Sequence, residues 1–141
     1  NAFEFAKPQI KDLDFSFSGL KTSILYTLQA AEKQQPNLRQ DKRNDLCASI
    51  QNSIVSILIA KLEKAVKETG IQTVVIAGGV SANSELRKRL LNKKDAGWKV
   101  GIPKMSYCTD NAAMIAMAGS FYLAAGHTVG QDVAADPRLK W

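Results

Sequence analysis

The chain is poor in the residues that build metal clusters and disulfide frameworks. Its 141 residues include two cysteines and one histidine. Cys47 and Cys108 lie far apart and lack the CxxC spacing of a zinc site. The sequence contains no HExxH pattern, which excludes a zinc protease of that type. His127 follows a predicted helix end, where we expect a surface role. Two unpaired thiols are typical of a reducing compartment, so the expected location is cytoplasmic.

Long apolar runs are also scarce. No run is long enough by inspection to span a bilayer, and no signal-peptide pattern opens the chain, so no membrane partner is expected. Hydrophobic residues make up 45% and charged residues 23%, a composition typical of one compact domain with a core. Asn1 and Ala2 are interpreted as a cloning remnant that precedes Phe3.

Positive charge is in moderate excess, with a net charge of +6. Five of the cations crowd one predicted helix: Arg87, Lys88, Arg89, Lys93 and Lys94. Such a cluster is usually a solvated helix face, and the alternative is a footprint for nucleic-acid phosphates. No RNA-binding motif with stacking aromatics accompanies it. The charge therefore permits a nucleic-acid partner without requiring one.

Hydrophobic periodicity predicts helices that alternate with strands, which indicates an α/β fold with part of its sheet parallel. The alternation of Leu13, Phe15 and Phe17 with polar residues predicts a strand, and Ser18 is the predicted cap of the next helix. The other predicted elements are helices over 20–34, 41–69, 81–91 and about 112–125, and strands over 71–77 and 98–102. Gly70 and Gly126 are the predicted helix ends. The strand count is small for a free-standing α/β domain and indicates a fragment.

The run from Ile76 to Asn83 carries the strongest local signal, because a buried strand leads directly into two glycines and a helix. Gly78 and Gly79 allow a sharp turn whose N–H groups are not covered by side chains. A strand, a bare turn and a helix N-terminus commonly hold phosphate or a nucleotide. The alternative is a tight connection in which Asn83 caps the helix.

A second candidate site opens the last predicted helix, in the segment from Cys108 to Ala116. One interpretation of Asp110 is a metal ligand. The alternative is that Asp110 caps the last helix, a role for which Thr109 is also a candidate. A single aspartate cannot hold a catalytic metal, so further ligands would have to come from elsewhere.

Three segments together resemble a known family: DFSFSGLKT from Asp14 to Thr22, IAGGVSAN from Ile76 to Asn83, and CTDNAAMIA from Cys108 to Ala116. The chain resembles the TsaD-like tRNA threonylcarbamoyladenosine synthases, formerly labelled O-sialoglycoprotein endopeptidases or glycoproteases. The resemblance implies the C-terminal lobe, over residues 1–141, of an actin-like ATPase (ASKHA, RNase H-like) fold with a small sheet packed with helices. The family's N-terminal lobe, with its HxxxH metal pair and glycine-rich segment, is absent.

The same resemblance implies an acyltransferase in which the amine of the tRNA adenosine at position 37, beside the anticodon, attacks threonylcarbamoyl-AMP and AMP leaves. Asp110 matches the family's aspartate ligand of an iron or zinc ion, and Asn83 matches the asparagine that contacts the nucleotide. Gly78 and Gly79 are expected to let the main chain approach that ligand. A paralogous subunit and a small ATPase are the implied bacterial partners.

For this chain alone, the sequence predicts no catalytic residue, no bound metal and no transfer activity. Two other classes of function stay open. One is an ATPase or a sugar-kinase-like nucleotide-binding domain of the same superfamily, and the other is a non-enzymatic interaction module. Self-association of the chain is a further open alternative.

Overall fold

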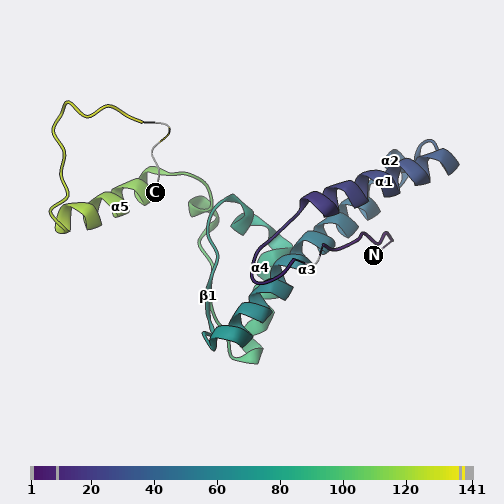
Figure 1. The fold of residues 1–141 in the computed structure, drawn as a ribbon, viewed down its shortest axis with the longest axis horizontal. Helices are drawn as coiled ribbons and strands as arrows, with labels where there is room; N and C mark the ends of the chain where they lie inside the picture. The colour runs from purple at the N-terminus through teal and green to yellow at the C-terminus, as the bar shows by residue number, and fades with distance from the viewer. Residues whose placement is uncertain (1, 9, 137, 139–141) are drawn as a thin grey trace.

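The computed structural model describes residues 2–8, 10–136 and 138. This part of the chain is a mixed arrangement of helices and one small parallel sheet (Figure 1). Its elements, in chain order, are α1 (Ser18–Gln34), α2 (Leu38–Asp41), α3 (Arg43–Thr69), β1 (Thr73–Val75), the 3-10 turn η1 (Gly79–Ala82), α4 (Ser84–Asn92), η2 (Lys93–Ala96), β2 (Lys99–Gly101), η3 (Met105–Tyr107) and α5 (Ala112–Ala124). The expected α/β class is confirmed.

The sheet consists of β1 and β2, which pair in parallel with Val74 opposite Val100. Parallel neighbours need a crossover connection, and α4 lies in it. Val74 is 7% exposed and Val75 is 69% exposed, because successive side chains point to opposite faces of a strand. One face of the sheet is therefore covered, and the face that carries Val75 is open in the described part of the chain.

The main core lies between α3, α4 and the covered face of the sheet. Its buried members are Val55, Ile59, Val74, Leu86, Leu90 and Trp98. A second cluster joins α1 and the N-terminal segment to α3 through Leu20, Phe5 and Ile57. Figure 1 shows α1 running along α3. The long helix thus separates two apolar layers and positions α4, which carries the candidate glycine turn at its start.

Helix α3 agrees closely with the sequence prediction, since it begins at Arg43 and ends at Thr69, and its C-cap Gly70 has a left-handed φ of 70°. The spacing of apolar residues in the sequence predicts six core positions on this helix, and two of them, Leu46 and Ile57, are buried. The other four, Ile50, Ile54, Leu58 and Leu62, are half-buried and pack against the two clusters. The most buried apolar residue of the helix, Val55 at 1% exposed, was not predicted.

By length and composition alone, α3 is apolar enough to cross a bilayer. The sequence expectation that no such run exists is wrong by this measure. A core helix passes the same test, and α3 packs on α1 through one cluster and on α4 and β1 through the other. The measure is therefore weak support for a membrane role.

The predicted strand over Leu13, Phe15 and Phe17 is wrong, because these residues form no secondary structure and each is exposed. An alternating run forms a strand only when a neighbouring strand accepts its hydrogen bonds. In the described residues the sheet holds β1 and β2 alone. The predicted Ser18 cap is also wrong, since Ser18 is the first residue of α1 and its hydroxyl pairs with the Ser16 hydroxyl at 2.9 Å.

Helix α5 has the predicted extent, and Gly126 follows it with a left-handed φ of 78°. None of its residues is buried. Figure 1 shows α5 standing apart from the layer formed by α3 and α4. Its exposed apolar side chains include Met114, Ile115, Phe121 and Leu123. The sequence predicts an irregular tail over 129–141, and those of its residues that the structure describes form no helix or strand.

Candidate functional site

The segment from Gly78 to Ala82, here called the glycine turn, lies between the end of β1 and the start of α4. Gly78 has φ 78° and ψ 179°, a conformation that only glycine adopts readily. The Ser81 hydroxyl donates to the Gly78 carbonyl at 2.6 Å, and the Ser81 N–H donates to the same oxygen at 3.0 Å. An added Cβ on Gly79 would meet no atom within 4 Å. The turn is thus fixed internally at Ser81 and faces open space at Gly79.

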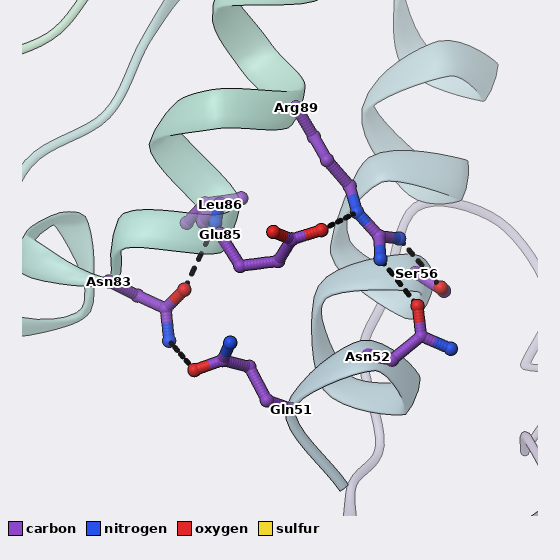
Figure 2. Close-up of polar contacts among 7 residues, drawn as sticks. All are labelled: Gln51, Asn52, Ser56, Asn83, Glu85, Leu86 and Arg89. Carbon is purple, nitrogen blue, oxygen red and sulfur yellow. Dashed lines mark hydrogen bonds and ion pairs between the residues drawn. The ribbon is translucent and has the colours of Figure 1, made fainter. Parts of the chain in front are cut away.

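Asn83 is the N-cap of α4, as one of its two predicted roles requires. Its Oδ1 accepts a hydrogen bond from the Leu86 N–H at 3.0 Å, and its Nδ2 donates to Gln51 Oε1 at 3.4 Å (Figure 2). The helix therefore begins at Ser84, three residues later than predicted, because η1 occupies the intervening turn. The oxygen is committed to the cap. The amide nitrogen has only a long contact, and its predicted role at a ligand stays a prediction.

Asp110 lies exposed between η3 and α5, and it is not the cap of the last helix. Asn111 caps α5, since its Oδ1 accepts from the Met114 N–H at 3.0 Å while its Nδ2 donates to the Thr109 carbonyl at 2.9 Å. The prediction of Thr109 or Asp110 as cap is therefore wrong, because the cap lies two residues after Thr109 and one after Asp110. The Asp110 carboxylate is consequently left facing solvent, without a hydrogen-bonding role in the helix.

The metal-ligand chemistry of the described residues is limited. Residues 2–8, 10–136 and 138 contain no group of three or more His, Cys, Asp or Glu side chains arranged to hold a metal ion. Asp110 therefore stands as a single prospective ligand.

Arg87 connects the glycine turn to the segment that precedes Asp110. Its Nη1 donates to the Ser81 carbonyl at 2.8 Å and to the Cys108 sulfur at 3.6 Å, and its Nη2 donates to the Pro103 carbonyl at 2.7 Å. Ser81 and Cys108 are each 1% exposed. The structure thus brings together the two segments that the sequence analysis had treated separately.

From the sequence, Arg87 is only one of five cations predicted to lie on one helix, and its contacts within the site are not expected. The predicted helix over 81–91 gives no signal, because it places Arg87 in the second turn, whereas in the structure Arg87 is the fourth residue of α4. A cation in the first turn of a helix is disfavoured by the helix dipole unless something else stabilises it. Two carbonyl oxygens supply that stabilisation here.

Other members of the basic cluster, which lie on α4 and η2, are also bound within the chain. Arg89 Nε donates to Glu85 at 2.7 Å, and its other two nitrogens donate to Ser56 at 2.9 Å and to Asn52. Lys93 pairs with Glu63. Lys88 and Lys94 are exposed. Most of the cluster therefore serves internal contacts, and a solvated helix face describes only Lys88 and Lys94.

An open apolar hollow of about 290 Å³ lies beside the glycine turn. It is lined by Phe15, Leu58, Leu62, Val75, Ile76, Ala77, Val80, Ser81 and Leu86. This lining includes turn residues but not Gly78, Gly79, Asn83 or Asp110. The candidate residues therefore lie outside the hollow, where Gly78, Gly79 and Asp110 are exposed and Asn83 is half-buried.

Comparison with known proteins agrees with the sequence resemblance. A family model described as "TsaD: tRNA N6-adenosine threonylcarbamoyltransferase" matches residues 1–117. A relative of that name from Riemerella anatipestifer is 47% identical over 141 residues, which cover 99% of this chain and 41% of the relative. Relatives of the same name from Christiangramia forsetii and Thermosipho africanus are 55% and 44% identical, over 84% and 99% of this chain.

The chain spans less than half the length of these relatives, namely 41%, 35% and 42% of them. The matched residues 1–117 include both the glycine turn and Asp110. A family match over most of the chain, together with identities above 40%, establishes that this chain belongs to the TsaD family of tRNA N6-adenosine threonylcarbamoyltransferases.

Proposed function

We propose that this chain is the C-terminal lobe of a two-lobe tRNA threonylcarbamoyltransferase with an actin-like ATPase fold. The observation that carries the proposal is the family match, which extends over the glycine turn and Asp110. The partial coverage of the relatives supports a missing lobe. So do the open face of the sheet and the unburied helix α5, because large exposed apolar surfaces usually meet another surface.

In the proposed reaction, the exocyclic amine of the tRNA adenosine at position 37 attacks the carbamoyl carbon of threonylcarbamoyl-AMP. The new C–N bond forms as the bond from that carbon to the phosphate oxygen breaks, the amine loses a proton, and AMP leaves. This chain contributes binding and orientation. The N-terminus of α4 attracts the donor phosphate, since its N–H groups and dipole favour an anion.

The glycine turn and Asn83 are assigned to the nucleotide part of the donor. Open space at Gly79 lets a ligand approach the main chain closely. Asn83 Nδ2 is the freer half of the amide, because Oδ1 is held by the helix cap and the Gln51 contact is long. An oxygen or nitrogen of threonylcarbamoyl-AMP that accepts a hydrogen bond from Asn83 Nδ2 replaces the Gln51 contact at little cost in free energy.

Asp110 is assigned as one ligand of a divalent iron or zinc ion in the full-length protein. Its exposed carboxylate supports that assignment, since Asn111 has taken the capping role. The described residues do not complete a metal site, so the remaining ligands must come from the other lobe. No step of the reaction is assigned to a metal held by this chain alone.

The partners that follow from this function are tRNA, threonylcarbamoyl-AMP, a paralogous subunit and a small ATPase, in the cytoplasm. The internal contacts of Arg87, Arg89 and Lys93 leave Lys88 and Lys94 as the cations of the basic cluster most accessible to tRNA. The cluster is therefore at most a minor part of the tRNA-binding surface.

The test is to incubate the full-length protein that contains this chain, with its partner subunits, with tRNA and threonylcarbamoyl-AMP. Digestion of the tRNA and mass spectrometry should detect threonylcarbamoyladenosine. The 141-residue chain alone should produce none, and modification by it would contradict the assignment as a lobe fragment. Phosphate release from ATP without tRNA modification would favour the superfamily ATPase. Neither activity would favour an interaction module.

A further inference from the structure

We propose that Arg87 is a positioning residue that holds two segments in fixed relation to each other. One is the glycine turn, and the other is the Asp110 segment, which runs from Pro103 to Asp110. Arg87 Nη1 donates to the Ser81 carbonyl and to the Cys108 sulfur, and its Nη2 donates to the Pro103 carbonyl. The effect on catalysis rests on the function proposed above. The structural coupling does not depend on that function.

The contacts form a continuous path between the two candidate site segments. The Ser81 side chain holds the Gly78 carbonyl, and the Ser81 main chain accepts from Arg87. Beyond Arg87, Cys108 is held through its sulfur, which also contacts the Lys104 carbonyl at 3.5 Å. Asp110 follows two residues later. A shift of the guanidinium would therefore move both segments.

The geometry requires arginine rather than any cation. The planar guanidinium presents several N–H donors in a rigid fork, so it donates to two carbonyls that are 22 residues apart in sequence. Lysine carries its donors on one nitrogen and lacks the fork. Arg87 has no ion-pair partner among the described residues, so its charge is stabilised by carbonyl dipoles at the site itself.

Arg89 is a matched control on the same helix. It also binds three side-chain or main-chain partners, but these are Glu85 within α4 and Asn52 and Ser56 on α3 (Figure 2). Arg89 thus fastens α4 to α3, whereas Arg87 fastens the two site segments. Loss of either arginine removes a comparable set of hydrogen bonds. Only the loss of Arg87 should free the glycine turn to move relative to the segment that leads to Asp110.

The experiment compares Arg87→Lys, Arg87→Met and Arg89→Met in the full-length protein, by hydrogen exchange and by transfer kinetics. Four main-chain amides report on the turns, namely those of Ser81, Asn83, Tyr107 and Cys108, which donate to the carbonyls of Gly78, Val80, Lys104 and Met105. In both Arg87 variants, the four amides of the η1 and η3 turns should exchange about tenfold faster or more. The reason is that these turns open locally once the Arg87 hydrogen bonds are lost. Arg89→Met should leave these four amides protected.

The kinetic measurement separates positioning from stability. At temperatures where every variant is folded, kcat/KM for threonylcarbamoyl-AMP should fall by about a hundredfold in both Arg87 variants, because small misplacement of reacting groups is costly. Arg89→Met should stay within about twofold, since its contacts lie outside the site. Arg87→Lys keeps a cation on the helix and preserves a folded variant if Arg87→Met does not fold.

Faster exchange in only one of the two turns would overturn the proposal, because it would show that Arg87 does not couple them. Equal kinetic losses in Arg89→Met and the Arg87 variants would also overturn it, by reducing Arg87 to a stabilising contact. Coordinated exchange in a full-length protein that never modifies tRNA would support the coupling and refute the proposed function instead.

Discussion

If Asn83 contacts the donor as proposed, variants of that residue should separate stability from donor affinity. Replacing Asn83 by alanine removes the hydrogen bond from the Leu86 N–H to Oδ1, which is 3.0 Å long. Loss of such a cap costs about 1 kcal/mol in the free energy of unfolding. The Nδ2 contact to Gln51 is 3.4 Å long, and a neutral bond at this limit adds less than about 0.5 kcal/mol.

Loss of a contact between Asn83 and threonylcarbamoyl-AMP would cost more free energy than loss of the cap, and it would appear in donor affinity and not in unfolding. A hydrogen bond from Nδ2 to a charged phosphate is worth about 1.5–3 kcal/mol. Since about 1.4 kcal/mol corresponds to a tenfold change in Kd, Asn83→Ala should weaken binding of an unreactive donor analogue by about tenfold or more. Asn83→Ser keeps a capping oxygen but no amide donor. Serine should therefore restore the free energy of unfolding without restoring affinity.

Gln51→Ala is the matched control, because it removes the partner of Nδ2 and leaves the cap in place (Figure 2). It should change the unfolding free energy by less than about 0.5 kcal/mol and leave donor affinity unchanged. The measurements are urea unfolding and calorimetric titration of the full-length protein with the analogue. If affinity follows stability across the three variants, Asn83 acts only as a helix cap and its assignment to the nucleotide is wrong.

Two further predictions use neighbouring residues as internal controls. Asp110→Ala should abolish most transfer and lower the amount of bound metal, while the melting temperature of the metal-free protein stays unchanged. Asn111→Ala should instead cost about 1 kcal/mol of stability as a lost cap and retain activity. Near-normal turnover of Asp110→Ala would exclude a ligand role. Gly78→Ala should cost about 1–3 kcal/mol because of its positive φ. Gly79→Ala should leave the free energy of unfolding almost unchanged, because the added Cβ would enter open space. It should weaken donor affinity, because that space is part of the proposed site. Equal effects of the two glycine variants on unfolding and on donor affinity would argue against this division of roles.

Features that depend on near neighbours were predictable from the sequence. The left-handed end of α3 at Gly70 and the Asn83 cap both involve residues within one helical turn. The same holds for β1 and β2, whose apolar runs are bounded by turn residues on either side. The three family segments needed no structure at all, and the comparisons confirm the family that they indicated. The Asn111 cap was missed by one or two residues because helix starts are the least certain part of a periodic pattern.

Features that depend on distant partners were not predictable. The alternating run from Leu13 to Phe17 has the period of a strand, but the described chain offers it no neighbouring strand to pair with. The apolar helix α5 and the core helix α3 both have the composition of buried helices, yet α5 has no buried residue and α3 has six. Burial requires a facing surface, and periodicity within one segment does not reveal whether that surface exists.

The chemistry of the site divides in the same way. The sequence by itself determined the family, the glycine turn, and the presence of an amide and a carboxylate at two helix starts. Only the tertiary structure decided that Arg87 joins those places, because its partners at Ser81, Pro103 and Cys108 lie 6, 16 and 21 residues away in sequence. A rigid cation finds such partners only after β1, α4 and β2 have packed, so its role is a property of the fold and not of the local sequence.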